Sequence, residues 1–234
     1  MMKITKKMLL GCALWLGVFA QAQAEVINWS EPALAPLKQF LIQENIAQHF
    51  WPALTEVKMV NLPEPYDFLL TQPLMTMGIA KFYQRTPKVR SPLYVIDNPS
   101  QKTYSRAILM IVDNNKSRDD ALAADKLGEA TVAELGISHI NFAALTPRAI
   151  DSVLHTQIPL GAILADNQIS THPSNVRYFK LNCTKVLDPY LNCSQHPVLY
   201  GRTNTLVRDD NGQWVVRVVE ILTGNQLPGQ SKGT

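Results

Sequence analysis

Two apolar segments, 198-VLYGRTNTLV-207 and 213-QWVVRVVEIL-222, flank the turn sequence 208-RDDNG-212. Asn-Gly is one of the strongest short signals for a tight turn between antiparallel strands. We therefore expect a β-hairpin near the end of the chain. The second segment is apolar at nearly every position from Val215 to Leu222, which is typical of a strand buried on both faces. We expect this strand to lie centrally in a sheet.

Further strands are predicted upstream of this hairpin. Residues 93–97 and 104–112 are rich in β-branched and aromatic side chains, and Asn98-Pro99-Ser100 between them favours a turn, so they predict a second hairpin. Short apolar runs at 161–165 and 175–181 are also interpreted as strands.

Helices are predicted mainly in the first two thirds of the chain. Residues 34–50 have helical spacing, and residues 65–85 predict one or two helices broken at Pro73. Ser117 as an N-cap and Gly136 as a C-cap bound a predicted helix over 117–135. Thr146-Pro147 opens another, running to about residue 156. Strands outnumber helices in the second half and the turns are tight, so we expect an α+β fold with an antiparallel sheet and helices packed on one face.

The first 24 residues have the three parts of a secretory signal peptide. Three lysines precede the apolar run 8-MLLGCALWLGVFA-20, and small residues alternate up to Ala24. We expect cleavage after Ala24 and export, to the periplasm. An uncleaved anchor is one alternative, and lipidation at Cys12 is another, less favoured because the apolar run continues past this cysteine.

Removing this leader changes the charge of the chain. It takes away three of the 22 basic residues and none of the 19 acidic ones, so the net charge falls from +3 to zero. A neutral domain has no bulk attraction to nucleic acid or anionic lipid, and we expect neither as a partner. We divide the chain into a signal peptide (1–24), an N-terminal helical or irregular extension (25–65), one domain (66–224) and a flexible tail (225–234), and we expect a monomer.

Two cysteines, Cys183 and Cys193, remain after the leader is removed. In an oxidising compartment an even pair tends to form a disulfide, which here would close a short loop. Two free buried thiols are the alternative. Ten-residue spacing without a companion Cys/His pair is not a zinc pattern, the five histidines are scattered, and we expect no metal.

Single charged residues in apolar strands are the candidates for a functional site. Arg106, Arg177, Arg202 and Glu220 each stand among apolar neighbours, and an unpaired charge in a buried strand costs several kcal/mol. Guanidinium groups suit carboxylates, so a few Arg and one Glu in an apolar pocket suit a small acid and a proton transfer. Internal Arg–Glu salt bridges on a solvated sheet face are the alternative interpretation.

Six short segments occur in order from about residue 69 to 224: 69-LLTQPLMT-76, 105-SR-106, 158-IPLG-161, 177-RYF-179, 199-LYGRT-203 and 219-VEIL-222. Together they resemble the chorismate lyase family, whose members split chorismate into 4-hydroxybenzoate and pyruvate. The resemblance implies an antiparallel sheet of about six strands, helices on one face and an enclosed ligand site. Family enzymes act where chorismate is made, in the cytoplasm, whereas the leader predicts export.

The resemblance also implies roles for individual residues. Glu220 and Arg106 take the catalytic positions. Arg106 binds a substrate carboxylate, and Glu220 either takes the proton or holds the ring hydroxyl that becomes the phenol. The remaining matched positions are assigned to substrate binding: Met75, Leu160, Arg177, Gly201 and Arg202. Loss of enolpyruvate restores aromaticity to the ring, so no cofactor is expected.

Two functions are consistent with these residues. The first is a carbon–oxygen lyase that releases pyruvate from chorismate or a related acid. The second is an exported, non-catalytic domain that binds a small aromatic or carboxylic acid. The combination of Arg106 and Glu220 favours the enzyme, because a simple carboxylate binder has little use for an acidic side chain in its pocket.

Overall fold

The computed structural model describes residues 26–90, 92–193 and 196–227. The expected leader, with Cys12 and Ala24, lies outside the described residues. Residues 228–234 of the expected tail also lie outside them. The elements in chain order are η1 (Pro32–Leu34), α1 (Ala35–Gln43), η2 (Gln48–Phe50), β1 (Leu54–Val57), η3 (Met59–Asn61), α2 (Tyr66–Leu70), α3 (Met75–Tyr83), β2 (Lys88–Val89), β3 (Tyr94–Asn98), β4 (Thr103–Asp113), α4 (Ala121–Lys126), β5 (Ala130–Asn141), η4 (Phe142–Ala144), α5 (Pro147–His155), α6 (Leu160–Asp166), β6 (Thr171–Asn182), α7 (Asp188–Leu191), β7 (Val198–Arg208) and β8 (Trp214–Leu222).

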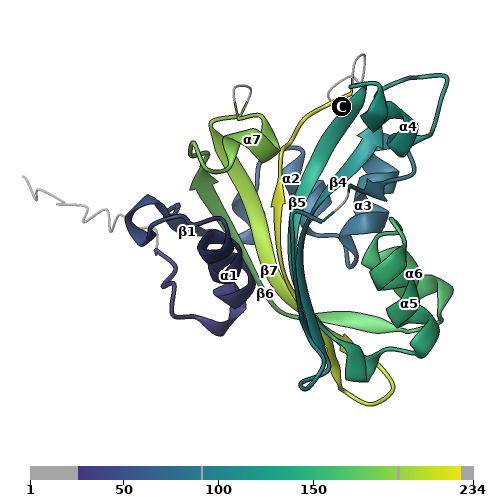
Figure 1. The fold of residues 1–234 in the computed structure, drawn as a ribbon. Helices are drawn as coiled ribbons and strands as arrows, with labels where there is room; N and C mark the ends of the chain where they lie inside the picture. The colour runs from purple at the N-terminus through teal and green to yellow at the C-terminus, as the bar shows by residue number, and fades with distance from the viewer. Residues whose placement is uncertain (1–25, 91, 194–195, 228–234) are drawn as a thin grey trace, which may run out of the picture.

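A single antiparallel sheet of eight strands organises the fold, which confirms the expected α+β class. Seven strands follow the order β1-β6-β7-β8-β5-β4-β2, and β3 pairs with β4 (Figure 1). Strand β8 is the middle strand of this order, as its apolar sequence predicts. The predicted hairpins β3–β4 and β7–β8 are both present.

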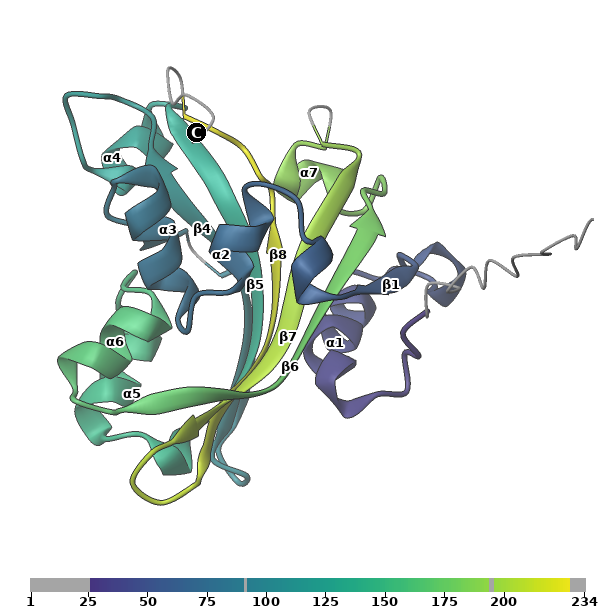
Figure 2. The ribbon, with the colours of Figure 1, turned by 180° about the vertical axis from the view of Figure 1, so that it is seen from behind.

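Helices cover both faces of the sheet, so the expected arrangement on one face is wrong. Helix α1 buries Leu37, Phe40 and Leu41 against one face, in a core with Leu135 and Phe179. Helices α2, α3, α5 and α6 pack on the opposite face, as Figures 1 and 2 show from the two sides. The apolar stripe of α1 has to be buried somewhere, and the sheet face left open by the other helices accepts it.

The sheet has eight strands, more than the approximately six expected. The additional strands include β1, of four residues, and β2, of two. Strand β1 pairs with β6, so the segment 25–65 joins the same sheet as the rest of the chain. Edge strands this short carry too few alternating positions to be detected from sequence.

The largest error of sequence interpretation concerns the segment 117–135. A helix over this whole range is wrong: α4 covers only Ala121–Lys126, and Asp120 instead of Ser117 caps it by accepting from two backbone N–H groups. The chain then turns at Gly128 (φ +71°) and enters β5, where Gly136 lies inside the strand. Pairing with β4 and β8 overrides the helical preference of residues 130–135.

Residues 161–165 are also misassigned, because they belong to helix α6. A short apolar run has the same appearance in a buried strand and in a buried helix. The remaining main elements follow the prediction. Helix α5 begins after Thr146, whose hydroxyl accepts from the N–H of Ala149, and α2 and α3 are separated near Pro73.

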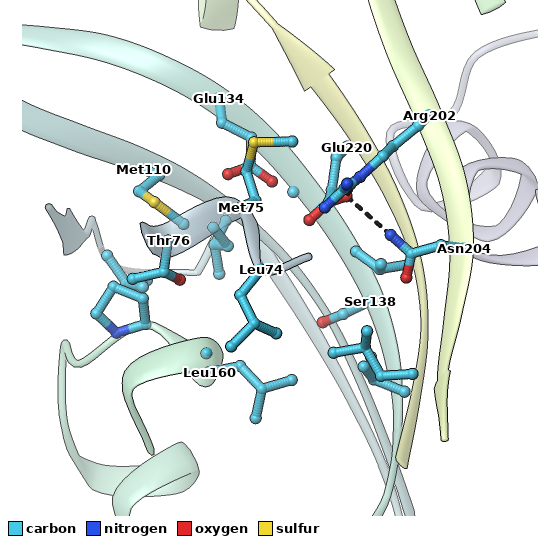
Figure 3. A pocket seen from close by; sticks show the side chains of 18 of the residues that line it. Leu74, Met75, Thr76, Met110, Glu134, Ser138, Leu160, Arg202, Asn204 and Glu220 are labelled. Carbon is cyan, nitrogen blue, oxygen red and sulfur yellow. Dashed lines mark hydrogen bonds and ion pairs between the residues drawn. The ribbon is translucent and has the colours of Figure 1, made fainter. Parts of the chain in front are cut away.

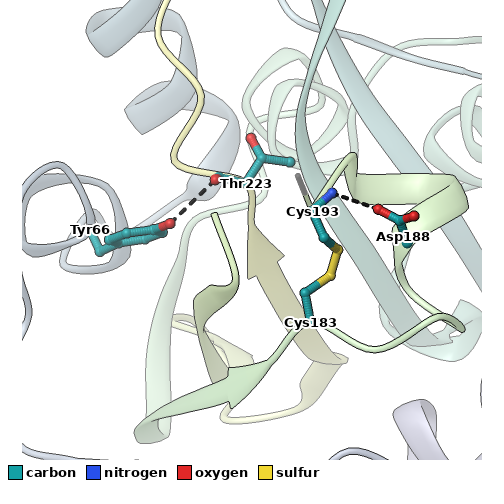
Figure 4. Close-up of a disulfide and its surroundings, with 5 residues drawn as sticks. All are labelled: Tyr66, Cys183, Asp188, Cys193 and Thr223. Carbon is teal, nitrogen blue, oxygen red and sulfur yellow. Dashed lines mark hydrogen bonds between the residues drawn. A yellow bond between two sulfur atoms is a disulfide. The ribbon is translucent and has the colours of Figure 1, made fainter. Parts of the chain in front are cut away.

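A disulfide joins Cys183 to Cys193 (Figure 4), as expected for the even pair of cysteines that remains after the leader. The Cα atoms are 5.8 Å apart, within the usual range for a disulfide. The closed loop contains α7 and buries Leu187 and Leu191 in the core on the α1 face. Asp188 accepts from the N–H of Cys193 at 2.9 Å.

Loss of this disulfide is expected to lower the free energy of unfolding by about 2–3 kcal/mol, because a short closed loop limits the entropy of the unfolded chain. The measurement is urea denaturation of the Cys183→Ser/Cys193→Ser variant against the wild type, with thiols titrated in both native proteins. Two reactive thiols in the native wild type would contradict the pairing.

None of the helices in the described ranges combines the length and the apolar character that crossing a bilayer requires.

Candidate functional site

A pocket lies between the sheet and helices α3 and α6 (Figure 3). Its cavity is about 70 Å³, which is space for on the order of five water molecules. A pocket of this size suits a small molecule. Strands β4, β5, β7 and β8 form its floor, and its lining comprises Pro73, Leu74, Met75, Thr76, Val89, Arg106, Ile108, Met110, Glu134, Gly136, Ser138, Pro159, Leu160, Gly161, Arg202, Asn204, Leu206, Val216, Val218 and Glu220.

The strand register explains which side chains reach the floor. Successive residues of a strand point to opposite faces, so even-numbered positions of β4, β7 and β8 face the pocket, and odd-numbered ones such as Ala107 and Val219 face α1. Arg106 is paired with Ser138, while Gly136 is paired with Glu220, and Glu220 with Arg202. The register thus places Arg106 and Ser138 in one row across the sheet, and Glu220 and Arg202 in the adjacent row.

Glu220 is held at the pocket by two neighbours on β7. Oε2 of Glu220 accepts from Nε of Arg202 and, at 3.1 Å, from Nδ2 of Asn204 (Figure 3). Arg202 also donates to the carbonyl oxygens of Leu70, at 2.7 Å, and of Gln72. Burial opposes the charge of Arg202, but the attraction and hydrogen bond of Glu220 outweigh burial, and the pKa of Arg202 is raised. Arg202 therefore positions Glu220 and fixes the segment between α2 and α3.

Arg106 is a buried cation of a different kind. Only 3% of its surface is exposed, and it donates to the carbonyl of Val153 on α5 at 3.1 Å. No carboxylate in the described part of the chain forms an ion pair with it. Burial lowers its pKa, because a charge without a counter-ion is costly in the interior. The pocket accordingly contains a guanidinium group able to bind an anion.

The two predicted apolar residues of the site come from the helices. Met75 begins α3 and is buried, and Leu160 begins α6. The two helix ends are in close contact: a Cβ atom at Gly161 would lie 2.9 Å from Oγ1 of Thr76. Glycine here lets the two helices close together over the polar rows of the sheet.

Two of the predicted residues lie outside the pocket. Gly201 faces α1, and a Cβ atom there would lie 2.7 Å from the ring of Phe179 and 2.4 Å from the carbonyl oxygen of Glu220, so this glycine serves close packing. Arg177 lies on the same face as Phe179 and forms ion pairs with Glu56 and Glu31. Assigning these two to substrate binding disregards the alternation of side chains along β6 and β7.

Sequence reasoning missed four polar side chains of the pocket: Thr76, Glu134, Ser138 and Asn204. Glu134 and Ser138 were concealed by the helix expected over 117–135 and its expected C-cap at Gly136. One signal in the sequence would have found them, because it has the period of a strand. Glu134, Gly136 and Ser138 alternate with the apolar residues Leu135 and Ile137.

No protein-family model matches the chain, and no curated protein matches its sequence. Among solved structures, the chain is similar to the C-terminal domain of Yurk from Bacillus subtilis. The two are 13% identical over 62% of this chain and 93% of that chain, with a TM-score of 0.39. We draw no conclusion about function from a likeness at this level.

Proposed function

We propose that this protein is a carbon–oxygen lyase of the chorismate lyase type, which releases pyruvate from chorismate and leaves 4-hydroxybenzoate. The observation that carries the proposal is Arg106, a buried guanidinium without a carboxylate partner among the described residues, in a pocket that also contains Glu220. A substrate carboxylate would supply the missing counter-charge, in the geometry that guanidinium groups bind best.

The spacing of Arg106 and Glu220 supports a ligand with two polar ends. They lie two strands and two residues apart in the register. With strands about 4.8 Å apart and a rise of about 3.3 Å per residue, their backbones are roughly 12 Å apart. Side chains of a strand stand roughly perpendicular to the sheet, so two groups that rise from backbones this far apart leave room for one ring between a carboxylate and an oxygen substituent.

The remaining lining supports the binding of a ring. Met75, Leu160 and Ile108 supply apolar surface above and beside the polar rows. Such a lining excludes water, and exclusion of water strengthens the contact between Arg106 and a carboxylate. The ring would thus be held by packing and oriented by its charged end.

Glu220 is assigned the proton transfer. Its two hydrogen bonds from Arg202 and Asn204 both end on Oε2, which leaves Oε1 as the acceptor that we assign to the substrate. Removal of a ring hydrogen next to the carbon that loses enolpyruvate completes the aromatic ring. The gain of aromaticity supplies the driving force of the reaction.

Export belongs to the same proposal. The disulfide between Cys183 and Cys193 supports an oxidising compartment, and the leader sequence supports secretion to the periplasm. Fractionation of the native host tests this part separately, with the protein expected outside the cytoplasm.

The test of the activity is incubation of the purified mature protein with chorismate, followed by measurement of pyruvate and 4-hydroxybenzoate. Equal amounts of the two products are expected, and Glu220→Gln is expected to slow their release by on the order of 10²–10⁴-fold, the usual contribution of a general acid or base. Glu64→Gln, an exposed carboxyl change away from the pocket, is the matched control. Binding of 4-hydroxybenzoate without release of pyruvate would reject the lyase and identify a non-catalytic binding domain.

A further inference from the structure

A second carboxyl group, that of Glu134, lies in the pocket and has no part in the mechanism given above. Glu134 is 2% exposed, and its Oε2 atom is buried without a hydrogen-bond partner. The register of β5 against β4 shifts next to it, between Met110 and Ile111. Such a bulge redirects side chains, and Figure 3 shows Glu134 and Glu220 extending from neighbouring strands toward the same cavity.

The two carboxyl groups, of Glu220 and Glu134, have different hydrogen-bond partners. Glu220 accepts hydrogen bonds from Arg202 and Asn204 and forms an ion pair with Arg202. Glu134 receives none at Oε2, and its position diagonal to Glu220 in the register puts the two backbones about 7–8 Å apart. Burial first, and then the charge of Glu220, raise the pKa of Glu134 well above its ordinary value, although Arg202 acts in the opposite direction.

The other charged and titratable groups of the pocket do not reverse the upward shift in the pKa of Glu134. Arg106 and Arg202 are the cations that line it, and Arg202 is already committed to Glu220. The pocket-lining segments at the starts of α3 and α6, residues 73–76 and 159–161, contain no titratable side chain. Space is reserved for the carboxyl group itself, because a Cβ atom at Gly136 would lie 3.0 Å from Oε1 of Glu134.

We propose that Glu134 is a neutral carboxylic acid in the resting protein and donates its proton to an oxygen atom of the bound ligand. In the lyase reaction, and resting on that proposed function, this atom is the ether oxygen of the enolpyruvyl group. The bond from the ring carbon to this oxygen breaks, its electron pair stays on oxygen, and oxygen takes the proton of Glu134. Glu220 takes the hydrogen of the neighbouring ring carbon, whose electron pair forms the double bond that completes the ring.

The cycle balances without a further reagent. The leaving group departs as the enol of pyruvate, which isomerises to pyruvate, and the ring departs as 4-hydroxybenzoate. Glu220 ends protonated and Glu134 ionised. Proton exchange between them, directly or through water after product release, restores the starting state. The pair thus has one acid and one base, set by their different surroundings.

Glu134→Gln separates the two functions of a neutral acid, because an amide donates a hydrogen bond but cannot transfer a proton. We expect it to bind 4-hydroxybenzoate within about threefold of the wild type and to slow pyruvate release, in kcat, by on the order of 10²–10³-fold. Glu134→Leu, which lacks a donor, is expected to raise the KM for chorismate about tenfold, while its binding of 4-hydroxybenzoate, which lacks the enolpyruvyl oxygen, stays within about threefold of the wild type. Glu64→Gln is the control for a carboxyl-to-amide change on the surface.

The protonation state is measured apart from activity. The infrared carbonyl band of a neutral carboxylic acid is expected at neutral pH in the wild type and is expected to be absent from Glu134→Gln. A folded state that keeps Glu134 neutral holds more protons than the unfolded state above the ordinary pKa of 4.5. The wild type therefore loses stability as pH rises from that value, and its Tm is expected to fall relative to that of Glu134→Gln.

The outcomes distinguish this inference from the lyase proposal. A wild type that releases pyruvate while Glu134→Gln does so equally fast overturns the proton transfer from Glu134 and leaves the lyase standing. A wild type that releases no pyruvate overturns the lyase, and the infrared band then decides separately whether Glu134 is neutral. Absence of the band, or a Tm difference that does not change with pH, overturns the neutral state.

Discussion

Arg202→Met is expected to lower the free energy of unfolding by about 3–5 kcal/mol, the usual cost of removing one partner of a buried ion pair. The side chains of Arg202 and Glu220 are 2% and 8% exposed, so water cannot replace the lost guanidinium. The carbonyl groups of Leu70 and Gln72 lose a donor at the same time. Urea denaturation, with the slope compared between variants, measures the change.

Two further variants show the origin of this loss. Arg90→Met removes a partly exposed ion pair with Asp125 and is expected to cost less than about 1 kcal/mol. Arg202→Met/Glu220→Leu removes both charges and is expected to recover part of the stability, because no buried charge remains unpaired. A single variant Arg202→Met as stable as the wild type would contradict a buried pair at this position.

The sequence predicted those parts of the fold that local patterns determine. The turn 208-RDDNG-212 and the cap at Thr146 act through adjacent residues, and the structure confirms the hairpin and helix that they predict. The short edge strands and the position of α1 depend on contacts with distant parts of the chain. Their partners, such as β6 for β1, cannot be identified from the local sequence.

The difference between local patterns and distant contacts also explains which site residues could be predicted. Arg106, Arg202 and Glu220 are conspicuous as charges in apolar strands, and the structure brings them to one pocket. Arg177 has the same appearance in sequence but meets Glu56 on the other face of the sheet. A charged residue in an apolar strand therefore indicates that a partner exists, while the face of the strand decides whether that partner is the protein or a ligand.

Arg106 differs from Arg202 in a way that predicts opposite effects on stability and binding. Arg202 is satisfied by the protein itself, whereas the described part of the chain offers Arg106 a carbonyl group and no carboxylate. Removing an unpaired buried charge relieves the protein of a desolvation cost. Arg106→Met is accordingly expected to unfold at the same temperature as the wild type or at a higher one.

The same variant, Arg106→Met, is expected to weaken binding of 4-hydroxybenzoate by on the order of 10²–10³-fold, because a buried carboxylate that loses its cation forfeits about 2–5 kcal/mol. Arg106→Lys keeps the charge but not the bidentate geometry, so its affinity for 4-hydroxybenzoate is expected to lie between those of the wild type and Arg106→Met. Calorimetric titration at neutral pH gives the affinities, and Arg217→Gln, a cation stacked on Trp214 away from the pocket, is the control for loss of charge.

The methyl ester of 4-hydroxybenzoate completes a cycle that isolates the contact between Arg106 and the carboxylate. The wild type is expected to bind the acid more tightly than the ester, by about the same factor as the loss of affinity for the acid in Arg106→Met. Arg106→Met itself is expected to bind the acid and the ester with equal affinity. Equal preference in both proteins would mean that the carboxylate binds elsewhere, and the lyase proposal would lose the observation on which it rests. A loss of preference with an unchanged or higher Tm would identify Arg106 as a residue kept for its ligand, since a residue kept for the fold lowers stability when it is removed.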